Sequence, residues 1–490
     1  MTTDCPQQLT FWKVGKQEVT ATFDGARVVT DAGLLALRAF EQELHILAEV
    51  ADRLPDPRAQ KFVVHTREAV LTQRVYQILA GYPDGNDAQV LRDDPLFRTL
   101  VGVDPDGEQG LASGSTVNRF HYAYTRRQAE LPVEERPVLL EQQEALNERL
   151  HILNAYLPEL YCRTRRTPPR SVIVDLDASD DPTHGQQVLS FFNGYFEQHQ
   201  YFPLFAFDGE TGFPLAAWLR PGTAHASWGA VAVLDQIVRC LRAAWPEVLI
   251  LVRGDNGLAV PAMYEYCERE GLLYAFGYAS NNVLKDRTEA TLADLETYYY
   301  WYGDREPELQ HFLAFEDYQA DGWTRPRRIV AKLEVNRLGT NRRFVVTNLT
   351  WQPQGVYHGF YVQRGNVPEK PLRELKHGLE MDRLSCHGFR ANGLRLLEHV
   401  LAYALVVLYR QATAAAVPEM ATAEVSTWRT RLWKVSAVVV TSVRRICFRL
   451  SATWPERALF VRVHEAAMQF AQDLQRPEAV VPVALLPMLM

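Results

Sequence analysis

The order of apolar runs between residues 171 and 278 constrains the fold of this chain more than any other feature. Three runs come first, SVIVDLDAS, YFPLFAFD and FPLAAWLR, with a Gly-Glu-Thr-Gly turn between the last two. A helical pattern follows from about Ser227 to Ala244, and then come EVLILVRG, AVPAMYEYCERE and LLYAFGYA. Short β-branched and aromatic runs between turn residues predict strands, whereas apolar residues at three-to-four spacing predict helices. We therefore expect three hairpin-connected strands followed by helix, strand, helix and strand.

This element order is typical of a ribonuclease-H-like α/β core. We predict an α/β fold in which a β-rich insertion interrupts that core and mostly helical regions stand on either side of it. The expected divisions are a helical N-terminal region over 1–165, the first part of the core over 166–284, the insertion over 285–343, the second part of the core over 344–412 and a helical C-terminal region over 413–490.

Local patterns refine this outline. Residues Leu9–Val29 alternate like two strands with a turn at Asp24-Gly25, and Thr30-Asp31 is expected to cap one long helix over AGLLALRAFEQELHILAEV. In the insertion, the aromatic cluster TYYYWYGD and the stretches RRIVAKLEV and RRFVVTNL suggest β structure, and Thr427–Leu474 is expected to be helical. Further helices are expected around Arg67–Ala80, Asp87–Leu100, Ser115–Arg127 and Glu134–Tyr156.

Composition excludes several classes of protein. Hydrophobic residues make up 47% and charged residues 23% of the 490 residues, which is the balance of a globular chain. The six cysteines have no C-x-x-C spacing, which argues against a zinc ribbon or a disulfide scaffold. With no basic-then-apolar leader and no apolar run near the roughly 20 residues that span a bilayer, we expect a cytoplasmic protein without a membrane partner.

The net charge of −7 excludes a protein that coats nucleic acid by bulk charge alone. Residues 286–322 carry −8 of it, so the rest of the chain sums to +1 and its cationic patches are free to face nucleic acid.

Carboxylates at the ends of the predicted core strands are the strongest chemical signal. Asp175 and Asp177 are two residues apart on one strand, so they point to one face of the sheet, and Asp255 directly follows VLILVRG. Taken singly, such an aspartate more often caps a turn or pairs with arginine. Jointly, hard oxygen ligands from neighbouring strands are what a pair of magnesium ions needs, and two such ions support phosphoryl transfer.

A further acid is expected from the segment YVQRGNVPEKPLRELKHGLE. Glu369 and Lys376 are seven residues apart and share a face of an α-helix at ~100° per residue, whereas Glu374 points elsewhere. Tyr361 and Arg364, three apart, also share a face. An exposed helix with ordinary salt bridges is the alternative interpretation.

Several stretches together resemble a DDE-type insertion-sequence transposase of the group-one DDE-domain family. They are VIVDLDASDDPTHGQQ, YFPLFAFDGETGFPLAAWLRPGTAH, LVRGDNGLAVPAMYEYCEREGLLYAFGYASNN, RFVVTNL, YVQRGNVPEKPLRELK and FRANGLRLLEHVLAYAL, together with DAGLLALRAF, LRDDPLFRTLVG and LASGSTVNRF near the N-terminus. The resemblance covers nearly the whole chain.

The resemblance implies a catalytic triad of Asp177, Asp255 and Glu369 that holds two Mg²⁺ or Mn²⁺ ions, with Asp175 as an alternate ligand. It also implies a Tyr-Arg-Glu-Lys signature made of Tyr361, Arg364, Glu369 and Lys376, in which the tyrosine, arginine and lysine contact DNA. This chain has four residues between the arginine and the glutamate where the family has three, and Pro368 and Pro371 flank Glu369.

Basic clusters supply the expected DNA contacts, since phosphate contacts need lysine and arginine. One lies in the insertion and one in the tail, and solvated surface is the alternative for both. The insertion cluster comprises Arg325, Arg327, Arg328, Lys332, Arg342 and Arg343, and the tail cluster comprises Arg429, Arg431, Lys434, Arg444, Arg445 and Arg449.

The resulting expectation is a DNA transposase that binds double-stranded DNA, both the inverted repeats at its transposon ends and target DNA, and that cleaves and joins DNA as a homodimer at the bacterial nucleoid. The alternatives are a transposase-derived DNA-binding protein without catalysis and a ribonuclease-H-like nuclease. The presence of acids at all three triad positions favours catalysis over the first alternative. The long insertion and the basic tail argue against the second.

Overall fold

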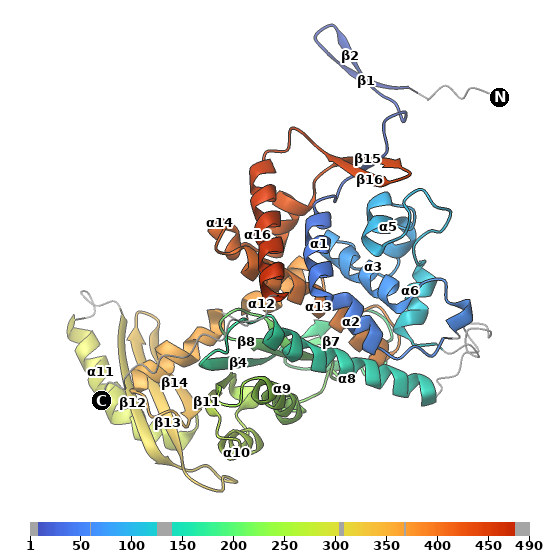
Figure 1. Cartoon of the computed structure of the whole chain (residues 1–490). Coiled ribbons are helices and arrows are strands. Elements are labelled where there is room, and N and C mark those ends of the chain that lie inside the picture. Colours follow the sequence, from blue (N-terminus) through green and yellow to red (C-terminus); the bar gives the residue numbers. More distant parts are fainter. Residues whose placement is uncertain (1–7, 59, 125–139, 303–307, 367–368, 476–490) are drawn as a thin grey trace, which may run out of the picture.

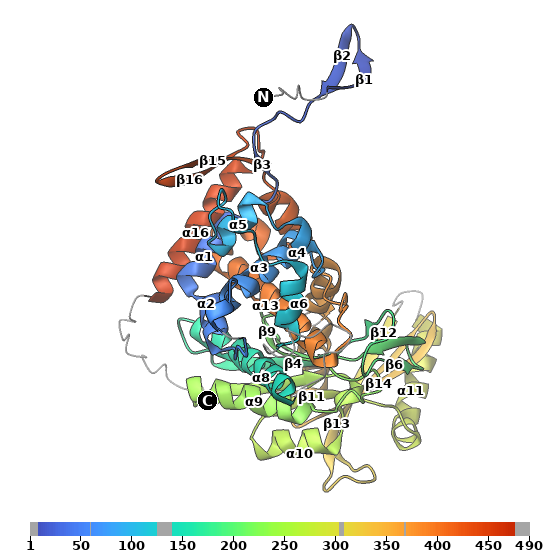
Figure 2. The same cartoon turned by 90° about the vertical axis from the view of Figure 1, so that its right-hand side faces the viewer.

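The computed structural model describes residues 8–58, 60–124, 140–302, 308–366 and 369–475. In Figures 1 and 2 a helical body lies on one side of the molecule, a large mixed sheet with its own helices lies on the other, and the long helix α8 lies between them. The helical body combines segments from both ends of the chain, so residues far apart in sequence pack together there.

The large sheet has eight strands in the order β12-β13-β14-β11-β10-β4-β8-β9. β4, β10 and β11 run parallel, whereas β8 and β9 follow β4 as antiparallel hairpin strands, as the sequence predicts. The five strands of the predicted core are β4 (Ser171–Ala178), β8 (Leu204–Asp208), β9 (Pro214–Trp218), β10 (Leu249–Gly254) and β11 (Leu273–Tyr278). The expected helices are α9 (Ala230–Ala244) and α10 (Pro261–Arg269).

The predicted insertion extends this same sheet. Its strands are β12 (Glu308–Tyr318), β13 (Arg327–Asn336) and β14 (Gly339–Thr347), and β14 pairs antiparallel with β11. The β prediction for the aromatic cluster is wrong, because Tyr298–Tyr302 end the helix α11 (Asn282–Tyr302). The side chain of Asn281 accepts a hydrogen bond from the backbone of Leu284 and so favours a helical start.

The helical body is built around α13 (Phe389–Thr413), which contacts α3, α8 and α16. By length and composition α13 could cross a membrane, but its apolar stretch is entirely buried inside the molecule, as in the core helix of a folded domain. Its surroundings include α1 (Leu34–Leu44), α2 (Ile46–Arg53), α3 (Arg67–Ala80), α4 (Asp87–Val90), α5 (Pro95–Val101), α6 (Gly114–His121), α8 (Leu140–Arg163) and α16 (Arg457–Gln475).

Both ends of the chain differ from the sequence predictions. The first strand pair, β1 (Leu9–Val14) and β2 (Gln17–Ala21), turns at Gly15 and not at Asp24-Gly25, and it projects away from the rest of the molecule (Figure 1). The single long helix is wrong as well, because His45 adopts a left-handed backbone conformation between α1 and α2.

The tail is not helical throughout. β15 (Ala437–Ser442) and β16 (Arg445–Leu450) form a hairpin that pairs with β3 (Val28–Val29) before α16 begins. The β-branched run Val-Val-Val-Thr in β15 has the composition that favours strands.

Candidate active site

Asp177 and Asp255 lie at the ends of two neighbouring parallel strands. In the pairing of β4 with β10, Asp175 is opposite Arg253, so two residues further along, Asp255 follows at the level of Asp177. The side chain of Asp255 accepts a hydrogen bond from the backbone of Gly257 at 3.0 Å and so caps the short 3₁₀ turn Asn256–Leu258. The parallel register therefore brings the two predicted catalytic aspartates to one edge of the sheet.

The electrostatics of Asp177 show that this pair concentrates negative charge. Burial raises the pKa of its carboxyl to about 6, the nearby Arg364 opposes that rise, and repulsion from Asp255 adds to it. The guanidinium Nη1 of Arg364 stands 3.8 Å from Asp177 Oδ2. Two partly buried carboxylates beside one arginine still favour a cation, because burial and repulsion from Asp255 both oppose the ionised form of Asp177.

Asp175, on the same strand as Asp177, is held in an ion pair with Arg253. It is fully buried, and its two oxygens accept hydrogen bonds from Arg253 Nε at 2.5 Å and Nη2 at 2.6 Å. Arg253 also donates to the backbone oxygen of Phe360 at 2.9 Å. Asp175 is thus held in a structural ion pair and is not available as a metal ligand. The sequence signal for this pair is the arginine inside the apolar run VLILVRG, which has to find an acid when it is buried.

Tyr361 and Arg364 reach the same edge of the sheet from an irregular helical segment. A π-helical stretch, Gly355–Tyr361, is followed by a 3₁₀ stretch, Val362–Asn366, and the Arg364 guanidinium lies 5.8 Å from the centre of the Tyr361 ring. π-helical turns occur frequently at functional sites. Tyr361 and Arg364 therefore lie close together, as predicted. The prediction assumed a regular α-helix, however, and the segment is not one.

Gly277 of β11 makes room for Tyr361. A Cβ atom at this position would lie 2.5 Å from the Tyr361 hydroxyl. Gly277 is not among the site residues expected from the sequence, although a glycine inside the strand LLYAFGYA is a signal of close approach.

Glu369 does not join the two aspartates in this structure. It is exposed at the start of the short helix α12 (Glu369–Arg373), and among the described residues no three carboxylate, imidazole or thiol groups come together as a metal cluster. Residues 367 and 368 of the four-residue spacer lie outside the described residues. Glu374, by contrast, faces away, buried against Arg410 at 2.7 and 2.8 Å and Tyr403 at 2.9 Å.

Lys376 sits in a π-helical turn, Glu374–Gly378, so the α-helical argument that aligned it with Glu369 does not apply. Its ammonium is 2.7 Å from Asp180, three residues after Asp177. The neighbouring Asp181 is fully buried, and neither of its carboxylate oxygens has a partner among the described residues.

Most of the predicted DNA-contacting residues in the insertion have acidic partners in the structure, whereas Arg343 is exposed and has none among the described residues. The pairs are Arg325 and Arg327 with Glu268, Arg328 with Glu316, Lys332 with Glu334, and Arg342 with Glu289.

The tail cluster divides in two. Arg429 is largely buried and donates to the backbone oxygens of Leu79 and Gly378, while Arg431 and Lys434 pair with Glu456 and Asp31. The remaining three, Arg444, Arg445 and Arg449, are exposed on the β15–β16 hairpin without an acidic partner in the described part of the chain.

Comparison with known protein families identifies the family of this chain. A family model matches residues 11–472, nearly the whole chain, and the chain therefore belongs to the DDE-domain transposases. The family is the one described as transposase DDE domain group 1.

Among solved structures, a cryo-EM structure of the piggyBac transposase synaptic complex with hairpin DNA aligns with 94% of this chain and 84% of that chain. The sequence identity is 13% and the TM-score is 0.41. No curated protein sequence matches the chain.

Proposed function

We propose that this transposase binds the ends of its own element, cleaves DNA and joins it to a target by metal-dependent phosphoryl transfer. The observation that carries the proposal is the pair Asp177 and Asp255 at matching strand ends, with Tyr361 and Arg364 beside them. The order β11-β10-β4-β8-β9, with three hairpin strands followed by parallel ones, supports our interpretation of the sheet as a ribonuclease-H-like core.

The aspartate pair suits a divalent cation. Both side chains offer hard carboxylate oxygens, and burial, together with repulsion from Asp255, raises the pKa of Asp177, so a bound cation would favour its ionised form. We propose Asp177, Asp255 and Glu369 as the protein ligands of two Mg²⁺ or Mn²⁺ ions, with Glu369 brought in by a shift of α12. Such ions, when bound, stabilise the attacking and leaving oxygens of phosphoryl transfer.

The chain's own residues would position the DNA. Arg364 carries a planar charged fork next to the aspartates and can grip a phosphate in two places. Tyr361 is held between Gly277 and Arg364, so its hydroxyl points to the same edge of the sheet. Lys376, which pairs with Asp180, would contact the phosphate backbone further along the bound DNA strand.

The experiment compares Asp177→Asn and Asp255→Asn with the unchanged chain on a duplex that carries the inverted repeats flanking the reading frame. We expect strand cleavage in Mg²⁺ to be lost, while binding in a mobility-shift assay stays within about threefold, because one ligand charge is removed without a change in the DNA contacts. Asp235→Asn, a half-exposed position on α9, serves as the control. Cleavage at the wild-type rate by both variants would instead favour a DNA-binding protein whose strand breaks come from another enzyme.

A further inference from the structure

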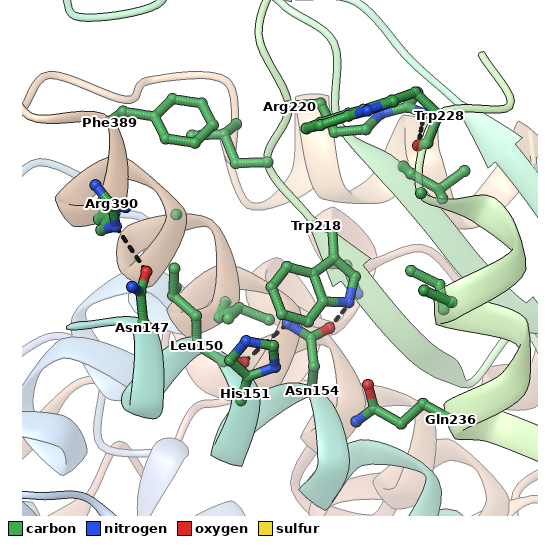
Figure 3. A pocket seen from close by; sticks show the side chains of 18 of the residues that line it. Asn147, Leu150, His151, Asn154, Trp218, Arg220, Trp228, Gln236, Phe389 and Arg390 are labelled. Atoms are coloured by element: carbon green, nitrogen blue, oxygen red, sulfur yellow. Dashed lines mark hydrogen bonds between the residues drawn. The ribbon is translucent and has the colours of Figure 1, made fainter. Parts of the chain in front are cut away.

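A buried arginine, Arg220, lies just beyond β9 in the loop that leads to α9. Its side chain is 2% exposed. The guanidinium Nη1 donates hydrogen bonds to the backbone oxygens of His225 at 3.2 Å, Ala226 at 2.7 Å and Trp228 at 2.9 Å. Figure 3 shows Arg220 and Trp228 together, with the last of these bonds as a dashed line. One guanidinium therefore holds the backbone of residues 225–228 in place.

Residues 225–228 pack against the turn that carries Asp255. Ala226 fills the space beside Gly257, where an added Cβ atom would lie 2.6 Å from the Cβ of Ala226. The backbone N–H of Gly257 in turn donates to the carboxylate of Asp255 at 3.0 Å. Burial lowers the pKa of the Arg220 guanidinium to about 10, and the nearby charge of Asp255 opposes that change. A shift of residues 225–228 would therefore be transmitted to Asp255.

The same side chain also holds the segment that leads into the strand beside Asp177. Arg220 Nε donates to the backbone oxygen of Phe202 at 2.8 Å, and the guanidinium lies 5.3 Å from the centre of the Phe202 ring. The backbone oxygen of Pro203 accepts a hydrogen bond from the backbone of Ser179 at 3.1 Å, and β8 then pairs with β4 alongside Asp177. Short paths thus join Arg220 to both of the segments that carry the aspartates.

We infer that Arg220 is a positioning residue that sets the separation of Asp177 and Asp255 by holding the two backbone segments beside them. This inference rests on the proposed function, in which the two aspartates hold metal ions. An arginine suits the task because its planar fork can donate to carbonyl oxygens in several directions from one buried point, whereas a lysine ammonium is a compact charge on a flexible stem. Groups that orient metal ligands typically contribute about 10–100-fold to metal affinity or activity.

The first test compares Arg220→Lys with Arg149→Lys in the full chain. Arg149 is the matched control, because it is also a fully buried arginine that donates to backbone oxygens, those of Pro55 and Phe120, at the contact between α8 and the helical body. Binding of Mn²⁺ to the protein without DNA, measured by electron paramagnetic resonance, should weaken by at least ~10-fold in Arg220→Lys and by less than about twofold in Arg149→Lys. DNA binding in a mobility-shift assay should be the same for both variants.

Amide hydrogen exchange followed by mass spectrometry tests the holding of the backbone directly, without metal or DNA. Peptides that cover residues 224–229 and 255–258 should exchange faster in Arg220→Lys than in the unchanged chain, because both segments lose their common support. Peptides from α13 should exchange at an unchanged rate. Faster exchange throughout the molecule, or equal losses of Mn²⁺ affinity in the two lysine variants, would show a general loss of stability and overturn the inference.

A second set of variants tests the contact between the loop and the Asp255 turn while the arginine stays in place. Gly257→Ala should weaken Mn²⁺ binding, because its Cβ would displace Ala226. Adding Ala226→Gly to that chain should restore at least part of the affinity, because it makes room for the new Cβ. If the double variant binds Mn²⁺ no better than Gly257→Ala alone, the loop does not act on Asp255 and the inference is wrong.

The inference and the proposed function would fail in different ways. Normal Mn²⁺ binding and an unchanged exchange pattern in Arg220→Lys would overturn the inference and leave the proposed function intact. Wild-type cleavage by Asp177→Asn and Asp255→Asn would contradict the proposed function. Faster exchange confined to residues 224–229 and 255–258 in Arg220→Lys would even then support the role of Arg220 in holding the two segments.

Discussion

The guanidinium of Arg364 stands 3.8 Å from the carboxylate of Asp177, although the two residues are 187 positions apart in the chain. Arg364 is mostly buried, and the nearby Asp177, Tyr361 and Asp255 raise its pKa against the effect of burial. The same arginine is therefore the counter-ion of Asp177 and, under the proposed function, would be the charged donor to a phosphate bound beside the aspartate pair. This double role leads to the first prediction.

Replacement of Arg364 by methionine should lower DNA cleavage by at least ~100-fold while the protein stays folded, because the phosphate loses its closest charged fork. Arg364→Lys should recover part of the activity, since it keeps the charge but not the planar fork. Single-turnover cleavage kinetics and thermal melting measure the two effects. Equal activity of the methionine and lysine variants would contradict a charge-based role.

The metal-free protein should become more stable when Asp177 is replaced by asparagine. Burial and Asp255 raise the pKa of this carboxyl in the folded protein to about 6 from its ordinary value of 3.8, so above pH 6 the folded protein carries a charge that it disfavours. Asp177→Asn should remove this cost and raise the free energy of unfolding by about 1–3 kcal/mol.

That gain should be fully present above pH 6 and should disappear as the pH falls below 3.8, where the wild-type carboxyl is protonated in both states. Denaturant titrations at pH 4 and pH 7.5 in the presence of a chelator measure it. Added Mg²⁺ should stabilise the wild type and not the variant. A variant that is less stable at pH 7.5 would show that Asp177 is held mainly by attraction to Arg364.

Substitution of Glu374 should affect the stability of the protein, whereas substitution of Glu369 should affect DNA cleavage. Glu374→Gln leaves Arg410 without its buried partner and should destabilise the protein by about 3–5 kcal/mol. Glu369→Gln changes an exposed side chain, so it should leave the melting temperature within about 1 °C and abolish cleavage. If Glu369→Gln cleaves normally, the third ligand is another residue.

Gly277→Ala should impair cleavage through Tyr361, because the new Cβ would lie 2.5 Å from the tyrosine hydroxyl. We expect a loss of at least ~10-fold in the cleavage rate, about 1.4 kcal/mol of transition-state stabilisation. Gly359→Ala is the control, since a Cβ there would meet no atom within 4 Å. The double variant Gly277→Ala with Tyr361→Phe should cleave no more slowly than Tyr361→Phe alone if the glycine acts through that hydroxyl.

DNA binding by the exposed hairpin should appear in the salt dependence of affinity. Replacing Arg444, Arg445 and Arg449 together by serine should reduce the slope of log affinity against log salt by up to about 3, since each phosphate neutralised contributes roughly 0.9. Serine at Arg325 and Arg342, which pair with Glu268 and Glu289, should change it less. A larger effect of the second pair would place the DNA over the insertion.

How far the sequence predicts this molecule depends on whether a feature is set by local or by distant contacts. The alternation of apolar runs predicts the five core strands, and Asp177 and Asp255 could be located because parallel strands end at one edge of a sheet. The helix α3 also matches its predicted range, Arg67–Ala80. In each case the spacing of apolar residues within one short stretch of chain is enough to predict the strand or helix.

Only the tertiary structure decided the features that depend on residues far apart in the sequence. It paired Asp175 with Arg253, bound Glu374 to Arg410, and set Tyr361 against Gly277. It also converted an expected α-helix into π and 3₁₀ turns and left Glu369 apart from the aspartates. The sequence by itself therefore determined which residue types stand at the strand ends. Which of those carboxylates is neutralised by an arginine was decided by long-range packing, because a buried charge takes the partner that the fold brings to it.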